Sequence, residues 1–196
     1  MLPDISFRGP APSDPEYDHE LRAELPAELQ RLLDEVGGVV AFGGGLHLRG
    51  PCLAPEWHSL RAAWRGPGAL HQSFEAVLPS DVPFAEDCVG DQYLLRGGEV
   101  VQLFAEVGEV EALGQGLDEF IAAAIADPEE VLCTEPLQVF LRDHEALSPD
   151  SALQVEPPFC EDADERSLAA VPRLALREVH AALAQRSAGE AAASER

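Results

Sequence analysis

The sequence predicts an α+β fold, in which a mainly antiparallel sheet is flanked by helices in a single domain. Three observations predict it: β-prone runs gather in the middle of the chain, glycine pairs separate some of them at hairpin spacing, and amphipathic helical patterns lie before and after them. The 196 residues are enough for one well-packed core.

The first part of the chain predicts an arm followed by two helices. Residues 1–20 are rich in proline and aspartate, which is typical of an irregular N-terminal arm. Residues 26–36 predict a helix, because Pro26 suits a first helical turn and Gly37-Gly38 suits a helix end. Residues 55–65 predict a second helix, in which the spacing of the apolar residues places both tryptophans in the core.

Short strands are expected between and after these helices. Val39 to Phe42 and Leu46 to Leu48 are β-prone, and Gly43 to Gly45 between them indicate a kink or bulge. His71 to Leu78 predicts another strand.

Residues 83–126 are the most informative stretch of the chain. They read as a strand, an acidic turn, a hairpin and an amphipathic helix. Gln92 to Leu95 and Glu99 to Phe104 form the hairpin strands, because Gly97-Gly98 between them supplies the positive φ angles of a tight turn. Gly90 allows the acidic turn before the hairpin to be sharp.

The rest of the chain predicts more strands, then helices. Asp127 is a suitable N-cap, with acidic residues following it in the first turn. Further strands are expected over residues 109–113, 153–155 and 168–171. Further helices are expected over residues 116–126, 128–133, 135–146 and 173–185. The predicted domain covers residues 21–186, and residues 187–196 are expected to be a disordered tail.

Several of these motifs together resemble the SUKH superfamily, which contains Smi/Knr-type fungal cell-wall regulators and many bacterial toxin-immunity proteins. One piece begins with Leu25-Pro26-Ala27-Glu28-Leu29 and ends at Gly37-Gly38. The other runs through Pro83-Phe84-Ala85, Asp87, Gly90-Asp91, Gly98-Glu99-Val100 and Leu117-Asp118-Glu119-Phe120. The matching pieces span residues 25 to 132, and residues 39 to 80 depart from the common pattern.

The resemblance implies a SUKH-like α+β domain over residues 21–186 and a role in binding another protein. For the immunity members, that role is to neutralise a toxin, often a nuclease or deaminase, by covering its active site. The alternative within the same superfamily is a regulatory or scaffolding module that binds a host protein.

The charge of the chain favours a basic protein partner. The formal net charge is −23, and residues 86–165 contribute 21 acidic residues against two arginines. Direct binding of nucleic acid is disfavoured because phosphate contacts need clustered Lys and Arg. Opposite potentials steer proteins together, whereas acidity can also serve solubility alone, and both interpretations remain open here.

Charge also selects the candidate partner-binding residues, which we expect to be exposed acids in two loops. The first loop carries Glu86, Asp87 and Asp91. The second loop carries Glu161, Asp162, Asp164 and Glu165. Neither loop has the spacing of a calcium loop, so a solvated acidic turn is favoured over a metal site.

No catalytic or cofactor motif is assembled in the sequence, and we expect a protein that is not an enzyme and has no cofactor. The four cysteines form no CxxC pair, and the six histidines lack the spacing of a zinc site. No GxSxG elbow or phosphate loop is present. A hydrolase with an acidic cleft remains the less favoured alternative. The absence of a long apolar run or a signal-like N-terminus predicts a cytoplasmic protein without membrane contact.

Overall fold

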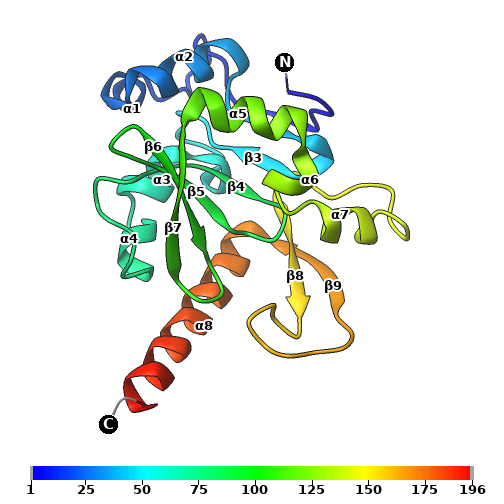
Figure 1. The fold of residues 1–196 in the computed structure, drawn as a ribbon. Helices are drawn as coiled ribbons and strands as arrows, with labels where there is room; N and C mark the ends of the chain where they lie inside the picture. Colours follow the sequence, from blue (N-terminus) through cyan, green and yellow to red (C-terminus); the bar gives the residue numbers. More distant parts are fainter. Residues whose placement is uncertain (1, 195–196) are drawn as a thin grey trace.

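The fold is built on a seven-stranded antiparallel sheet whose strands follow one another in chain order from β1 to β7 (Figure 1). The computed structural model describes residues 2–194, with side chains described up to residue 189. The strands of this sheet are β1 Phe7–Arg8, β2 Val39–Ala41, β3 Leu46–Leu48, β4 Val82–Asp87, β5 Gln92–Arg96, β6 Glu99–Phe104 and β7 Glu109–Gly116. Each pairs antiparallel with the next. Short connections join β2 to β3 and β4 to β7, whereas helices lie between β1 and β2 and between β3 and β4. The predicted α+β class with a mainly antiparallel sheet is therefore confirmed.

A separate two-stranded hairpin follows the sheet. Its strands are β8 Ser151–Glu156 and β9 Ser167–Pro172, which pair antiparallel along six residues each. Residues 157–166 connect them as a long loop, and the hairpin lies beside the start of the last helix, α8 Arg173–Ser194 (Figure 1). The remaining helices are α1 His19–Glu24, α2 Ala27–Val36, α3 Leu60–Arg65, α4 Leu70–Ser73, α5 Leu117–Ala126, α6 Pro128–Val131 and α7 Glu135–Phe140.

The two faces of the sheet are covered by different helices. Tyr93 and Leu95 point to the face covered by α1, α2 and α5, where the largest core cluster lies. Leu94, between them, points to the opposite face and packs with α4 and with Ala184 of α8. In Figure 1, α2 and α5 lie together on one side of the sheet and α8 leaves from the other side.

Most local predictions are confirmed. The β5–β6 hairpin turns at Gly97 and Gly98, with φ of 62° and 95°, and Gly90 has a φ of 90°. Asp127 caps α6 by accepting a hydrogen bond from the Glu130 amide.

The strand predicted over residues 71–78 is wrong, because this segment forms α4 and the turns that follow it. Leu70, Phe74 and Val77 are buried together against the sheet. Their spacing of four and three residues is helical, so one face of a short helix and turn buries all three. The glycine-rich break before β3 is a 3₁₀ turn, η1 Phe42–Gly44, that joins β2 to β3.

Three predicted helices differ from those in the structure. The helix expected over residues 55–65 is divided into η2 Glu56–His58 and α3, because Ser59 is extended and caps α3 with its hydroxyl. The helix expected over residues 135–146 ends at Phe140. The last helix continues to Ser194, into the segment for which the sequence predicts disorder, and residues 195–196 lie outside the described chain.

Candidate functional site: a buried ion network and an acidic hairpin face

The first acidic loop does not present two of its three acids to solvent, contrary to the prediction. Glu86 and Asp87 are the last residues of β4, where their side chains are 2% and 0% exposed. Glu86 lies opposite His47 of β3 in the strand register, which directs it toward the interior beside that strand. These two residues therefore cannot contact a partner without local unfolding.

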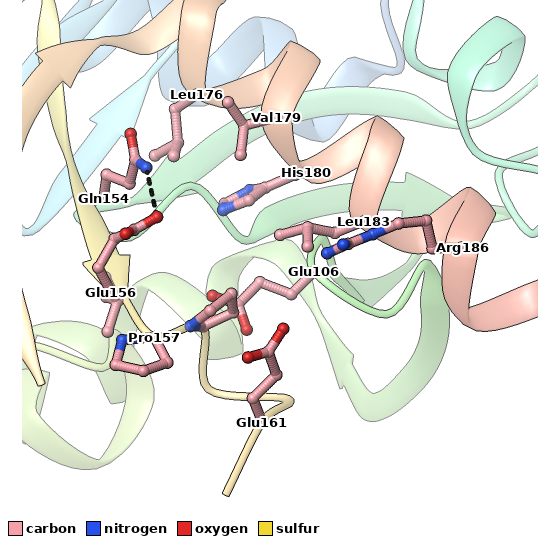
Figure 2. A pocket seen from close by; sticks show the side chains of 12 residues that line it. Glu106, Gln154, Glu156, Pro157, Glu161, Leu176, Val179, His180, Leu183 and Arg186 are labelled. Carbon is pink, nitrogen blue, oxygen red and sulfur yellow. Dashed lines mark hydrogen bonds between the residues drawn. The ribbon is translucent and has the colours of Figure 1, made fainter. Parts of the chain in front are cut away.

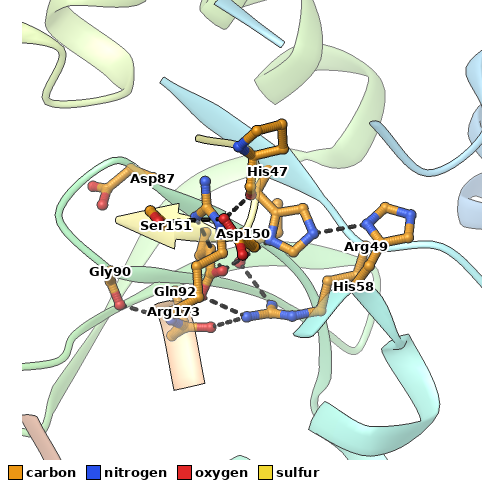
Figure 3. A network of polar contacts seen from close by, with 12 residues as sticks. His47, Arg49, His58, Asp87, Gly90, Gln92, Asp150, Ser151 and Arg173 are labelled. Carbon is orange, nitrogen blue, oxygen red and sulfur yellow. Dashed lines mark hydrogen bonds and ion pairs between the residues drawn. The ribbon is translucent and has the colours of Figure 1, made fainter. Parts of the chain in front are cut away.

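A buried polar network includes His47, Arg49, Gln92 and Arg173 (Figure 3), and all four bind the carboxylate of Glu86. Its Oε1 accepts hydrogen bonds from His47 Nδ1 at 2.8 Å and from Arg173 at 3.1 Å. Its Oε2 accepts from Arg49 at 2.8 Å and from Gln92 Nε2 at 2.9 Å. Arg173 is 87 residues away in sequence and is the first residue of α8, so the network ties the last helix to the sheet.

A second histidine extends this network. His47 Nε2 lies 2.9 Å from Nδ1 of the buried His58. Because Glu86 can only accept, His47 carries its proton on Nδ1, and its Nε2 accepts from His58. Nε2 of His58 faces three glycines, Gly9, Gly38 and Gly50. A Cβ atom on any of them would lie only 2.4, 2.4 or 2.8 Å from this nitrogen, so the buried ring leaves no room for a side chain there.

The network holds its carboxylate charged and its histidines neutral. Burial alone would raise the pKa of Glu86, but Arg49, His47 and Arg173 hold it well below its usual range. Burial lowers the pKa of His47 well below its ordinary value and that of His58 to about 3. Burial also lowers the pKa of Arg49 to about 10, so the guanidinium stays charged at neutral pH. Both oxygens of Glu86 are engaged, whereas Arg49 Nε, Arg173 Nη2 and His58 Nε2 have no hydrogen-bond partner among the described residues. A buried ion network of this kind makes the fold sensitive to the loss of any one partner.

Asp87 and Asp91 hold the turn that joins β4 to β5. Asp87 Oδ1 accepts from the amides of Val89 at 2.9 Å and of Asp91 at 3.0 Å. Asp91 Oδ1 accepts from the Ala105 amide at 2.8 Å. Burial, together with the neighbouring Asp91, raises the pKa of Asp87 well above its ordinary value, and burial raises that of Asp91 to about 6. These carboxylates therefore satisfy backbone donors that would otherwise be unpaired.

The second acidic loop is exposed, as the sequence predicts. Its four acids, Glu161, Asp162, Asp164 and Glu165, are all exposed in the connection between β8 and β9. Arg166 donates to the Glu161 carbonyl at 2.7 Å and stacks over the Phe159 ring. Phe159 is 48% exposed, so an aromatic ring stands at the surface among the loop carboxylates.

A pocket of about 400 Å³ opens between this hairpin and α8 (Figure 2). Glu156 of β8 and Glu161 of the loop line one side, and His180 and Arg186 of α8 line the other. Glu106, from the turn after β6, also lines the pocket, and its Oε2 accepts from the Cys160 amide at 3.0 Å. This hydrogen bond holds the loop against the sheet.

A smaller cleft of about 250 Å³ lies beside the pocket and shares Glu106 with it. Asp91 lines this cleft together with Glu109 and Phe159, so the structure brings the half-buried acid of the first loop next to the second loop. We call the carboxylates that line the two hollows, together with the other exposed acids of the β8–β9 loop, the acidic hairpin face. Its members are Asp91, Glu106, Glu109, Glu156, Glu161, Asp162, Asp164 and Glu165.

The sequence alone does not mark the residues that distant segments bring to the pocket and to the buried ion network. Glu106, Glu156 and His180 carry no local motif, and only the packing of the hairpin against α8 unites them. The network residues Arg49 and Arg173 are equally unmarked. For Glu86 the local pattern is a poor guide, because the strand register shifts between Val82 and Ala85 and breaks the alternation of faces.

The cysteines do not form a reactive site in the described part of the chain. All four are free, and Cys52 and Cys88 are buried. Burial raises the pKa of Cys52 and of Cys133 to about 12 and that of Cys88 well above its ordinary value, so these thiols stay protonated. Among residues 2–194, no group of His, Cys, Asp and Glu has the arrangement of a metal site.

Comparison with known proteins leaves the family open. No protein-family model matches this chain, and no curated protein matches it either. No helix among the described residues is long and apolar enough to cross a bilayer.

Proposed function

We propose that this chain is a non-catalytic protein-binding module that docks a basic partner on its acidic hairpin face. The carrying observation is that five carboxylates line two adjacent hollows and that three more, Asp162, Asp164 and Glu165, are exposed in the same β8–β9 loop. With Arg166 and Arg186 as the neighbouring cations, this group has a net charge of −6. Such a surface attracts a basic protein and raises its association rate.

Phe159 supports the same interpretation. Aromatic side chains at the centre of an interface supply much of its binding free energy, while surrounding polar groups exclude water. Phe159 is exposed within the acidic loop and lines the smaller cleft, so a partner covering the loop would bury it.

The resemblance to the SUKH superfamily gives this module its proposed role. We assign it as an immunity protein that covers the active site of a cognate toxin, with a nuclease as the class whose basic cleft best complements an acidic face. A regulatory module that binds a host protein is the alternative, and it would use the same face for a basic host protein.

A pull-down from extracts of the source organism tests the proposal, with the chain as bait at low and then moderate salt. We expect a basic protein that is captured at low salt and released as salt rises, because screening weakens exposed charge pairs. Neutralising the loop with E161Q, D162N, D164N and E165Q should abolish the capture. Capture of a toxin supports immunity, and capture of a host regulator supports the alternative.

A matched control separates a specific face from overall charge. E35Q, E75Q, E130Q and E145Q remove four exposed carboxylates elsewhere and change the net charge by the same amount. Equal loss of the partner in both quadruple variants would refute the proposal, because the binding would then follow total charge rather than the acidic hairpin face.

A further inference from the structure

The pocket between the hairpin and α8 has two kinds of wall. Leu176, Val179 and Leu183 of α8 form an apolar wall. Glu106, Glu156 and Glu161 bring three carboxylates to its other sides, with Arg186 as the resident cation (Figure 2). Apolar surface beside a net negative rim suits a guest that has an apolar stem and a cationic end.

His180 gives this pocket an unused hydrogen-bonding group. Its side chain is 4% exposed, and Figure 2 shows the ring pointing from α8 into the pocket. Nδ1 has no hydrogen-bond partner among the described residues, and it lies close to Gly90 at the β4–β5 turn. Unpaired buried polar atoms are uncommon in folded proteins and are costly. Six side-chain atoms of this kind occur among the described residues, and Nδ1 of His180 is the one that belongs to a residue lining this pocket, so a guest in the pocket is one source of the missing donor.

The protonation state of His180 decides what it can accept. Burial lowers its pKa to about 4, although the charge of Glu86 acts in the opposite direction. At neutral pH the ring is therefore uncharged, with one nitrogen donating and the other accepting. A neutral imidazole among carboxylates does not repel a cation, and it adds an acceptor for one of the cation's N–H groups.

These features fit an arginine side chain better than a lysine. A guanidinium group offers five N–H donors in one plane, enough to serve several carboxylates and an imidazole together, whereas an ammonium offers three. The three-carbon stem of arginine can lie along the apolar wall. A volume of about 400 Å³ accommodates one such side chain.

We infer that the pocket receives an arginine side chain of the partner, with its guanidinium group facing Glu106, Glu156 and Glu161 and its stem on the α8 wall. The inference rests on the proposed function and makes it specific, since it names the anchoring residue that the partner supplies. Arg186 occupies the rim of the same pocket and should compete with the incoming cation.

The test uses the full chain and three short capped peptides that differ only in a central arginine, lysine or citrulline. Citrulline keeps the shape of arginine without its charge. NMR signals of the histidine rings report binding directly, and H180Q assigns the His180 signals. We expect saturable shifts of His180 with the arginine peptide, severalfold weaker binding of the lysine peptide and no binding of the citrulline peptide.

Variants of the pocket sharpen the test. E156Q with E161Q should weaken binding of the arginine peptide at least tenfold, and E35Q with E145Q should leave it unchanged. R186Q should strengthen it severalfold, because a competing like charge is removed. No shift of His180 with the arginine peptide, or equal shifts with citrulline, would overturn the inference.

Failure of this inference and failure of the proposed function give different results. If the arginine peptide binds while no basic protein is captured, the pocket assignment stands and the proposed function falls. If a basic partner is captured by wild type and by the E156Q/E161Q variant alike, the proposed function stands and the arginine pocket is refuted.

Discussion

The carboxylates at the end of β4 and those of the β8–β9 loop lie in opposite surroundings. Glu86 is 2% exposed and accepts hydrogen bonds from two arginines, a histidine and a glutamine. The acids of the β8–β9 loop are exposed, and the described chain offers them Arg166 as a cation in the same loop. The carboxylate of Glu86 thus has its hydrogen bonds satisfied within the fold, whereas the loop carboxylates repel one another and are open to solvent.

The acidity of the chain thus has a structural part, and an exposed part for which we propose a binding role. A buried carboxylate must be paired and hydrogen-bonded, so its removal leaves the charges of its partners uncompensated. An exposed carboxylate costs little to keep or to remove, because water and salt screen it. Changes at the β4 end should therefore alter stability, and changes in the loop should alter binding.

The largest expected effect comes from Glu86. Glu86→Gln removes the negative charge between Arg49 and Arg173 and should cost about 3–5 kcal/mol of unfolding free energy. Urea unfolding at neutral pH measures this cost. If the variant does not fold at all, Arg173→Met provides the second measurement, since it should cost less because Arg49 still compensates Glu86. A stability within 1 kcal/mol of wild type would show that the network does not hold α8 to the sheet.

The next largest effect is a loss of stability at low pH caused by the lowered pKa of His180. The pKa of His180 is about 4 in the folded protein and 6.5 when unperturbed, so between these values the unfolded chain binds the extra proton. Wild type should therefore lose stability as pH falls through this window. Relative to the H180Q variant, which cannot titrate there, the loss should reach about 3 kcal/mol at pH 4. Urea unfolding of both proteins from pH 7 to 4 isolates this contribution, and parallel curves would contradict it.

A smaller effect on stability separates two properties of Asp87: the acceptor oxygen that it offers to the turn amides, and its ionisable proton. Asp87→Ala leaves the Val89 and Asp91 amides without their acceptor and should cost about 1–3 kcal/mol. Asp87→Asn keeps the acceptor oxygen and should cost less. Because the folded-state pKa of Asp87 is raised, wild type loses stability as pH rises through that value, and the asparagine variant should not. Thermal unfolding at several pH values measures these differences. An equal loss of stability in both variants would show that the hydrogen bonds to the turn amides are not the cause.

The smallest expected effect comes from the exposed loop. E161Q, D162N, D164N and E165Q together should change the unfolding free energy by about 0.5 kcal/mol or less, because these side chains are exposed. The same variant is expected to lose its partner. A large loss of stability in this variant would mean that the loop acids are structural, as those of β4 are.

Local chemistry made much of the fold predictable. Gly97-Gly98 predicts the β5–β6 turn because the turn needs positive φ angles, and Asp127 predicts the start of α6 because the helix needs an N-cap. Both requirements are met by residues that are neighbours in the sequence. The sequence predicts a strand after Leu70, whereas the helical spacing of Leu70, Phe74 and Val77 fits the short helix and turn that the structure has there. Propensity is the weaker guide where packing decides.

The candidate site was predictable only where it is local. The exposed acids of the β8–β9 loop follow from a run of acidic residues with no apolar partner, whereas the burial of Glu86 depends on arginines 37 and 87 residues away. Gly38 shows the same limit. The sequence marks it as a helix end, but in the structure Gly37 has the positive φ and Gly38 makes room for His58.

The fold should need the buried carboxylate of Glu86 and should not need the exposed carboxylate of Glu161. The most direct measurement is the urea unfolding free energy of Glu86→Gln beside that of Glu161→Gln, at neutral pH and the same salt. Each variant removes one negative charge from an acidic residue of a predicted binding loop. We predict a loss of about 3–5 kcal/mol for the first and about 0.5 kcal/mol or less for the second. Equal losses would contradict the division between structural and binding acids.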